Sequence, residues 1–585
     1  MIKYATVLFL LLSFVLPAVA ADDSEQFRQI YEKEWAFRLQ QFPMFASWVG
    51  VHDYADQLGD VSEEAQAARN EFWKGIREEL QAVSCQRLQR EDCINYRIFI
   101  KQIDNFIADY ETRSYLMPFN SDWGFYMELA RLPKDASFSS LQDYRNYLGR
   151  LHQLPRVMDQ YIALMRKGLE LGITQPRVVL DGRDEPIKAQ LVEAAEQSPF
   201  YSPFQSIPES VAGGEKAELL ATAEQVISGG VIPAYQRLYD FFQEEYVPGA
   251  RKTLGASALP GGERFYRSQI SKYVTLDMGA DEIHRIGREQ VARIRGEMDS
   301  IIEEVDFEGD FAAFLEFLRT DEQFYAKTPK ELLAFASYYA KKIDGRLPMI
   351  IGHLPRQPYG VAPVPEDIAP FYTAGRYVSS PLDSHRGGYY WVNTYDLPSR
   401  PLYAIPALTL HEGAPGHHTQ GALAMEQAGQ PPFRRYDYIS AYGEGWGLYS
   451  EKLGLEMDIY ETPYEHFGRL TYEMWRACRL VIDTGIHAMG WTREQARDFL
   501  ASHTALSLHE VTTEIDRYIS WPGQALSYKL GEYTIWKLRA GAEQDLGDAF
   551  DIRAFHDFIL SLGSVPLDVL SEETAIWINE QQKKG

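Results

Sequence analysis

The chain has 585 residues, of which 45% are hydrophobic, 13% aromatic and 24% charged. This balance is typical of a globular protein and excludes disordered, collagen-like and coiled-coil classes. The 58 Lys and Arg residues against 83 Asp and Glu residues leave a formal net charge of −25. Because so acidic a surface repels phosphate backbones and anionic lipids, we expect no nucleic-acid partner and no attraction to anionic membranes.

Residues 1–20 predict a cleavable signal peptide. Lys3 precedes an almost unbroken apolar run that Pro17 ends, and Ala18-Val19-Ala20 is a small-x-small cleavage signal. The alternative is an uncleaved membrane anchor, for which the run is short. The run is not followed by a cysteine, which argues against a lipoprotein anchor. We therefore predict cleavage near Ala20 and a periplasmic or secreted mature protein that has left the membrane.

The cysteines fit an exported protein. Cys85 and Cys93 lie close enough in sequence to form one local disulfide in an oxidising compartment. Cys478 lies between apolar residues in a helical pattern, so we expect it to be buried rather than reactive. Three cysteines cannot form a disulfide scaffold, and the fold must therefore rest on its hydrophobic core.

Apolar residues recur with a helical period along most of the chain. We expect amphipathic helices over residues 25–38, 63–83, 94–110, 141–171, 215–246 and 280–305. Between Leu347 and Pro406 the density of Pro and Gly forbids long helices. Within this stretch Tyr389–Thr394 is rich in strand formers and predicts a short strand beside a cleft. Helical patterning then resumes, so the sequence predicts a mainly α fold.

The strongest chemical signal is a group of histidines with one glutamate near the end of an apolar helical pattern: His411, Glu412, His417 and His418. A His-Glu pair followed by another His is the arrangement by which a helix offers two imidazoles to zinc. The usual spacing is HExxH, but Pro415 stands at the position of the second His. On an unbroken helix the later His would lie about 10.5 Å along the axis, too far to share a metal. We therefore expect the helix to break at Pro415-Gly416.

Glu444 is the expected third metal ligand, since catalytic zinc usually has three protein ligands. It lies in an acidic, glycine-rich turn, on a different face from a predicted buried stripe: Tyr438, Tyr442, Trp446, Tyr449 and Leu453. Glu451 is the competing carboxylate, but its neighbour Lys452 suggests a more solvated place. Of the two adjacent histidines we favour His417, with His418 as the alternative. The other interpretation of the whole group is a core cluster without metal.

Four segments together resemble a known family: HEGAPGHHTQ, YGEGWGLYSEKLG, DTGIHAMGW and PGQALSYKLGE. They are similar to the bacterial family catalogued as domain of unknown function 885. That family is in turn similar to the helical gluzincin peptidases, which include the angiotensin-converting-enzyme, neurolysin and thermostable-carboxypeptidase groups. The resemblance implies a two-lobed helical fold around a deep channel, one zinc ion and peptide-bond hydrolysis. We expect an N-terminal helical lobe over residues 21–275 and a metal-bearing lobe over 276–585, working as one catalytic unit.

A second group of ionisable residues shares one face of an apolar helical segment: Arg476, Arg479, Asp483 and His487. Unpaired buried charge is costly, so these side chains need partners. One interpretation is an ion-pair network that holds helices together. The functional interpretation, favoured by the resemblance, is that His487 stabilises the oxyanion while Asp483 orients its ring. Arg479 would then lie behind these groups.

Further substrate contacts are expected late in the chain and beside the predicted strand. The resemblance implies a late Tyr that donates a hydrogen bond to the tetrahedral intermediate, and Tyr528 is the candidate; a packing role is the alternative. Arg517 has the fork geometry to hold a substrate carboxylate, although pairing with Glu514 is equally expected. We expect the strand to align an extended substrate by β-addition, with Asn393 contacting the substrate backbone.

Together these residues predict an exported zinc hydrolase of peptide bonds, in which Glu412 is the general base. A zinc amidase or isopeptidase acting on small or cell-wall-derived peptides would use the same residues. The non-enzymatic alternative is a periplasmic metal-dependent binding protein, which needs no general base. Nucleophilic catalysis is not supported, because the sequence contains no G-x-S-x-G motif and Cys478 lacks a catalytic setting.

Overall fold

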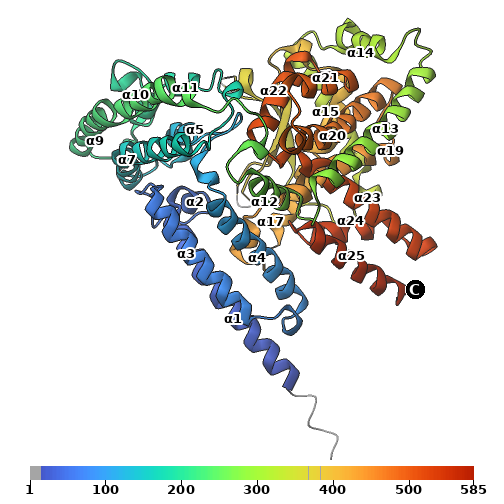
Figure 1. Cartoon of the computed structure of the whole chain (residues 1–585), viewed down its shortest axis with the longest axis horizontal. Helices are drawn as coiled ribbons and strands as arrows, with labels where there is room; N and C mark the ends of the chain where they lie inside the picture. Colours follow the sequence, from blue (N-terminus) through green and yellow to red (C-terminus); the bar gives the residue numbers. More distant parts are fainter. Residues whose placement is uncertain (1–14, 367, 382–383, 428, 585) are drawn as a thin grey trace, which may run out of the picture. The chain divides into compact units, whose positions relative to one another are not determined.

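The computed structural model describes residues 15–366, 368–381, 384–427 and 429–584. The predicted signal peptide therefore falls largely outside the described residues. The chain is mainly helical with one small sheet, as predicted (Figure 1). Among the described residues, no helix combines the length and the apolar character needed to cross a membrane.

The chain divides into two compact units. The first contains the described residues up to Lys252 together with Pro431–Tyr436, and the second contains Thr253–Gln430 and the described residues from Asp437 onward. The helices of the first unit are α1 Val15–Gln41, α2 Pro43–Trp48, α3 Glu63–Glu79, α4 Arg90–Glu111, α5 Phe125–Ala130, α6 Leu132–Asp135, α7 Leu141–Leu171, α8 Glu185–Lys188, α9 Gly213–Val226, α10 Ile232–Phe241, α11 Val247–Gly249 and α18 Pro432–Arg435.

The second unit contains all of the candidate site residues. Its helices are α12 Gly262–Val274, α13 Ala280–Glu304, α14 Phe311–Thr320, α15 Pro329–Arg346, α16 Ile405–Glu412, α17 His417–Glu426, α19 Ser440–Glu456, α20 Pro463–Met489, α21 Arg493–His503, α22 Leu508–Ser520, α23 Ser527–Leu546, α24 Ile552–Ser561 and α25 Leu567–Gln582.

The helix expected over residues 215–246 is interrupted in the first unit. The helices α9 and α10 are joined by a π-helical turn at Ile227–Val231, and a second such turn follows at Phe242–Tyr246. Pro233 lies at the start of α10 and has no backbone N–H to continue the ladder of hydrogen bonds from the preceding turn. The apolar period predicted the helical path but could not show these widened turns.

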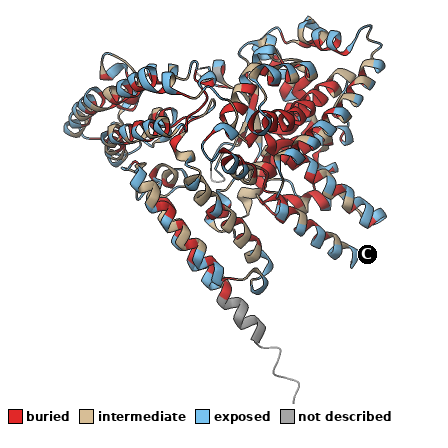
Figure 2. Cartoon of the chain, viewed as in Figure 1, coloured by how far each residue is buried: buried red, intermediate tan, exposed pale blue. Residues whose placement is uncertain are grey.

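α20 is the central helix of the second unit. Every residue from Phe467 to His487 is buried, so this helix is enclosed on all sides, as the red colour of its ribbon shows in Figure 2. α13 and α16 both pack against it. Gly287 permits the close approach of α13, because a Cβ atom there would lie 2.8 Å from the Cβ atom of Leu480.

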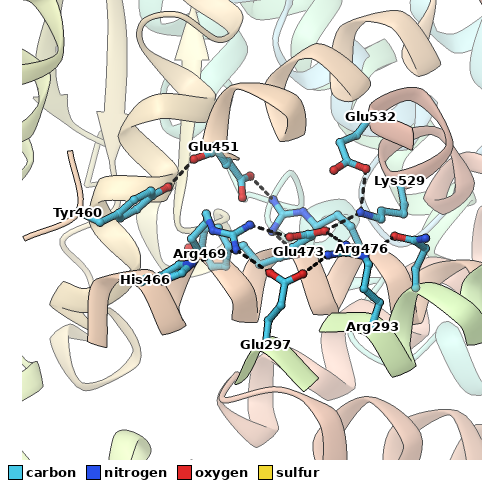
Figure 3. A network of polar contacts seen from close by, with 12 residues as sticks. Arg293, Glu297, Glu451, Tyr460, His466, Arg469, Glu473, Arg476, Lys529 and Glu532 are labelled. Atoms are coloured by element: carbon cyan, nitrogen blue, oxygen red, sulfur yellow. Dashed lines mark hydrogen bonds and ion pairs between the residues drawn. The ribbon is translucent and has the colours of Figure 1, made fainter. Parts of the chain in front are cut away.

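Charged side chains of three helices form part of the network in Figure 3, and we call these four the Glu473 cluster: Glu473 and Arg469 of α20, Lys529 of α23 and Arg293 of α13. The Glu473 carboxylate lies 2.8 Å from Lys529 Nζ and 2.6 Å from Arg469 Nη1, and it also pairs with Arg293. Burial opposes ionisation, but these three cations hold the pKa of Glu473 well below its usual value. These ion pairs therefore link α20 to α23 and α13.

The predicted strand is confirmed as β3 (Gly388–Val392), the central strand of a three-stranded sheet. It pairs in parallel with β1 (Tyr359–Pro363) and antiparallel with β2 (Gly375–Val378). Because both of its edges are hydrogen-bonded within the sheet, the prediction that this strand adds a substrate by β-augmentation is wrong. The edges of the sheet are β1 and β2.

The cysteine predictions are confirmed. Cys85 and Cys93 form a disulfide beside the start of α4. Cys478 is free and wholly buried in α20, where burial raises the pKa of its thiol. A thiol in such a setting is inert, which agrees with its expected packing role.

Candidate metal centre

The helix that carries His411 ends where the sequence requires it to break. α16 stops at Glu412, and α17 begins at His417 after the turn at Gly413–Gly416. Gly416 N–H donates to the carbonyl of Leu410 at 3.1 Å, which folds the turn back onto α16. A Cβ atom at Gly416 would lie 1.9 Å from the carbonyl oxygen of His411, so only glycine fits there.

This break brings together His411, His417 and Glu444, which we call the His411 cluster. Glu444 Oε2 lies 3.6 Å from His411 Nε2 and 3.4 Å from His417 Nε2. Ligands at about 2.0–2.2 Å from one zinc ion in tetrahedral geometry are separated by about 3.3–3.6 Å. The distances from the carboxylate to both imidazole nitrogens therefore fit a shared metal ion, and all three donor atoms lie within 4.8 Å of one another.

The electrostatics of the cluster also call for a cation. Burial would lower the pKa of His411, but the carboxylates of Glu444 and Glu451 outweigh it and raise that pKa to about 10. Burial would raise the pKa of Glu444, yet the two imidazoles hold it well below its usual value. Two carboxylates thus converge on His411, and a bound metal ion would supply the positive charge that they favour.

His411 is oriented by Glu451, whose carboxylate Oε1 lies 2.8 Å from His411 Nδ1. A carboxylate at Nδ1 keeps Nε2 available for a metal and fixes the ring. Glu451 is 1% exposed, so the expectation that it is solvated is wrong. The sequence cannot show that the side chain of Glu451 reaches His411 on α16 while that of Lys452 lies over the Trp536 ring of α23.

The glycine-rich segment around Glu444 lies inside α19 and is not the turn that we expected. A Cβ atom at Gly447 would lie 2.8 Å from the ring of His411, and one at Gly445 would lie 2.6 Å from the backbone of Gly531. The glycines therefore let the imidazole and α23 approach the helix closely. Four members of the predicted stripe are buried, whereas Tyr438 is 57% exposed.

Glu412 is held next to His411 by the sheet. Its Oε2 accepts a hydrogen bond from the backbone N–H of Tyr377 in β2, at 2.8 Å. Glu412 is 8% exposed, and its other carboxylate oxygen accepts no hydrogen bond from the described residues. One carboxylate oxygen is thus anchored while the other is available to accept a proton.

His418 points away from the cluster. Its Nδ1 lies 3.1 Å from the hydroxyl of Tyr377, and its ring packs against Tyr359 with centroids 4.5 Å apart. Burial lowers the pKa of His418 to about 4, which keeps the imidazole neutral. Of the two adjacent histidines, the structure therefore brings His417 to the His411 cluster and places His418 in an aromatic pocket.

The predicted role of His487 is contradicted by its contacts. Its Nδ1 accepts from the backbone N–H of Ala256 at 3.0 Å, and its Nε2 lies 2.9 Å from the carbonyl of Tyr518. Both ring nitrogens are used within the protein, so neither can donate to an oxyanion. Asp483 accepts from the Tyr266 hydroxyl at 2.6 Å and from a backbone N–H. The pair holds neighbouring segments around α20.

Asn393 is likewise structural. It is wholly buried, and its Nδ2 donates to the carbonyls of Ala369, Tyr372 and Thr373 while its Oδ1 accepts from Tyr395 N–H. An amide with all of these bonds made inside one loop cannot contact a substrate backbone. The expectation of substrate binding by Asn393 is therefore wrong.

Tyr528 lies among arginines at the start of α23. The Arg479 guanidinium stacks 4.3 Å from its ring centroid, and Arg517 Nη2 lies 3.5 Å from its hydroxyl. Arg479 is 2% exposed and pairs with Glu514 at 2.8 Å. Arg517 pairs with Glu514 at 3.5 Å, so the structural alternative for both arginines is present. The roles of Tyr528 and Arg517 toward a substrate stay predictions.

Two residues lie beside the site although the sequence did not predict a place for them there. Tyr377 contributes its backbone to Glu412 and its hydroxyl to His418. Tyr438 lies beside Glu444, with its ring against Gly443. The signal for Tyr377 was the short run Gly375–Val378, which alternates too briefly to stand out as a strand.

Comparisons with known proteins give a family and a fold. The family described as "Bacterial protein of unknown function (DUF885)" matches residues 43–573. The chain is similar to a candidate lipoprotein from Colwellia psychrerythraea, with 28% identity and a TM-score of 0.87 over 95% of this chain and 99% of that one. It shares its fold with a candidate lipoprotein of unknown function from Shewanella oneidensis, with 20% identity and a TM-score of 0.72 over 93% of this chain and 99% of that one. The comparison with curated proteins finds no match.

Proposed function

This chain belongs to the DUF885 family of bacterial proteins of unknown function, and we propose that it is a zinc-dependent hydrolase of peptide bonds. The observation that carries the proposal is the spacing of His411 Nε2, His417 Nε2 and Glu444 Oε2, 3.4–3.6 Å between the carboxylate and each nitrogen. Three nitrogen and oxygen donors from protein side chains are the set that catalytic zinc sites use. Because the same ligand types occur in the gluzincin peptidases, we also propose that the chain is related to them and shares their two-lobed fold around a channel.

Zinc bound here would polarise the scissile carbonyl and make water acidic enough to lose a proton near neutral pH. Glu412 accepts that proton through the oxygen that Tyr377 leaves available, and it then donates the proton to the leaving amine. Glu451 holds His411 in the orientation that presents Nε2. Tyr528 is our candidate to donate a hydrogen bond to the oxyanion.

We further propose that the protein works outside the cytoplasm. The signal-like residues 1–20 and the Cys85–Cys93 disulfide both favour an oxidising compartment. The description of the Colwellia protein as a candidate lipoprotein is consistent with export in this family.

The test is hydrolysis of a peptide mixture, followed by mass spectrometry, with zinc-loaded and chelator-treated protein. We expect cleavage that chelation abolishes and added zinc restores. Unblocked, N-blocked and C-amidated peptides of one sequence separate exopeptidase, endopeptidase and amidase action. The binding-protein alternative predicts no cleavage of any of them.

Glu412→Gln is the matched variant, since it keeps the shape of the side chain and removes its basicity. We expect it to bind zinc normally and to hydrolyse peptides about 10²–10⁴-fold more slowly. Glu263→Gln, at an exposed glutamate on α12, serves as the control and should hydrolyse at the parent rate. A zinc-loaded Glu412→Gln protein with the parent rate would refute the proposed base.

A further inference from the structure

The second unit contains a cavity of about 260 Å³ that is distinct from the His411 cluster. Its wall includes residues of α16, α20 and α22: Ile405, Leu408, Thr471, Tyr472, Leu508 and Glu510. Pockets for drug-sized ligands occupy about 300–1,000 Å³, so this cavity suits a smaller molecule. It begins one helical turn before His411 on α16.

Two opposite charges face this cavity without pairing. Arg400 and Glu510 both line it, yet within the described part of the chain no hydrogen bond or ion pair joins the two side chains. The other two charged residues of the wall are less suited to bind a ligand. Arg319 donates to three backbone carbonyls and is used structurally, and Glu316 is exposed. Arg400 donates from Nη1 to the carbonyl of Ser399 at 3.1 Å, but its charge is not paired with Glu510. Arg400 and Glu510 are therefore the charges available to a ligand.

Further polar atoms on the wall are buried without partners. Thr471 is 2% exposed, and its Oγ1 has no hydrogen-bond partner among the described residues. The Nε atom of Arg400 is also buried and has no partner among these residues. Burial raises the pKa of Glu510 to about 7, although the positive charge of Arg400 opposes that rise. Buried polar groups are rarely left unpaired, because their desolvation is then not offset by a hydrogen bond. These atoms are suited to hydrogen bonds with a polar ligand.

We infer that this cavity binds a small zwitterion, an apolar α-amino acid or dipeptide, with Arg400 holding its carboxylate and Glu510 its ammonium group. A molecule that carries both a carboxylate and an ammonium group can pair with Arg400 and Glu510 at once, although these two side chains do not pair with each other. Ile405, Leu408 and Leu508 provide apolar walls for its side chain. The site does not use the metal ligands, so it is independent of the proposed hydrolysis.

The test is isothermal titration calorimetry of chelator-treated protein with L-leucine and L-phenylalanine. Leucinamide carries only the ammonium group, N-acetyl-leucine only the carboxylate, and N-acetyl-leucinamide neither. We expect the zwitterions to bind, each single-charge analogue to bind about tenfold more weakly or worse, and the uncharged analogue to give no heat. Because no metal is present, this result does not depend on whether the protein is a hydrolase.

Two variants assign the charges. Arg400→Gln should weaken leucine binding about tenfold or more and leave leucinamide binding unchanged. Glu510→Gln should weaken leucine binding likewise and leave the binding of N-acetyl-leucine unchanged. Arg267→Gln, at an exposed position of α12, is the control. Equal affinities of the parent protein for leucine and N-acetyl-leucinamide, or no binding of leucine at millimolar concentration by the folded parent, would overturn the inference. The analogue series needs no variant and decides the matter if a variant fails to fold.

Discussion

The Glu473 cluster and the His411 cluster both lie in the second unit, but their charges are balanced in different ways. Glu473 is surrounded by Lys529, Arg469 and Arg293, which are permanent cations of the chain itself (Figure 3). Glu444 contacts two imidazoles, which are neutral unless protonated, and the hydroxyl of Tyr438, which is also neutral. The first arrangement is complete as a structural element, whereas the second favours a cation from outside the chain.

The largest effect is expected at the first of these clusters. Glu473→Gln removes the anion shared by Lys529, Arg469 and Arg293. It should destabilise the protein by about 3–5 kcal/mol, because the buried Lys529 and Arg469 keep only Glu532 and Glu297 to balance their charges. Thermal or urea unfolding measures this loss. Glu263→Gln on the surface should change stability by about 0.5 kcal/mol or less. A stable Glu473→Gln protein would show that the cluster does not hold the core together.

Removal of the metal should destabilise the protein through the His411 cluster and not through the Glu473 cluster. Zinc at 100 to 1,000 times its dissociation constant stabilises the folded state by about 2.7–4.1 kcal/mol, so chelation should lower the melting temperature accordingly. His411→Ala should abolish this response. Glu473→Gln, although less stable, should retain it. A His411→Ala protein that zinc still stabilises would place the metal elsewhere.

Glu451 should act through His411 rather than on a substrate. Glu451→Gln weakens the orientation of the imidazole and should lower zinc affinity about 10–100-fold. Competition with a chelator of known affinity measures this change. Once the variant is saturated with zinc, its KM should match that of the parent. A changed KM with unaltered zinc affinity would instead indicate substrate contact.

The smallest effect is a pH dependence at His556, which lies away from the metal ligands. Its Nδ1 bonds to the Ile350 carbonyl and its Nε2 to the Tyr449 hydroxyl, and burial lowers its pKa to about 3. In the unfolded chain this imidazole binds its proton near pH 6.5. The contribution of neutral His556 to the free energy of unfolding is therefore complete above that pH and is lost as the pH falls toward 3. From about pH 7 to about pH 5.5 the loss should be about 1 kcal/mol.

Melting temperature against pH measures this loss. His556→Gln should flatten the slope, while His52→Gln at an exposed position should preserve it. An unchanged slope in His556→Gln would mean that another group titrates in this range.

Features that depend on local chain geometry could be predicted from the sequence. The mainly α fold, the break at Pro415-Gly416 and the disulfide follow from periodicity, from a proline in a helix and from two nearby cysteines. The grouping of His411 with Glu444 needed one further step, since metal chemistry calls for a third ligand.

Features that depend on distant partners could not be predicted. The spacing of His487 on α20 gave no sign that Ala256 would occupy its Nδ1. The burial of Glu451 could not be predicted either, because its partner His411 lies on another helix. The strands β1 and β2 contain four or five residues each, and their pairing with β3 is non-local.

The most direct test of the account is the metal content per chain of the purified mature protein, measured by elemental analysis beside His411→Ala, Glu444→Gln and Glu473→Gln. The account predicts about one zinc per chain in the parent and in folded Glu473→Gln, and none in the other two variants. A folded parent purified without chelator that holds no metal and acquires none from added zinc would contradict it.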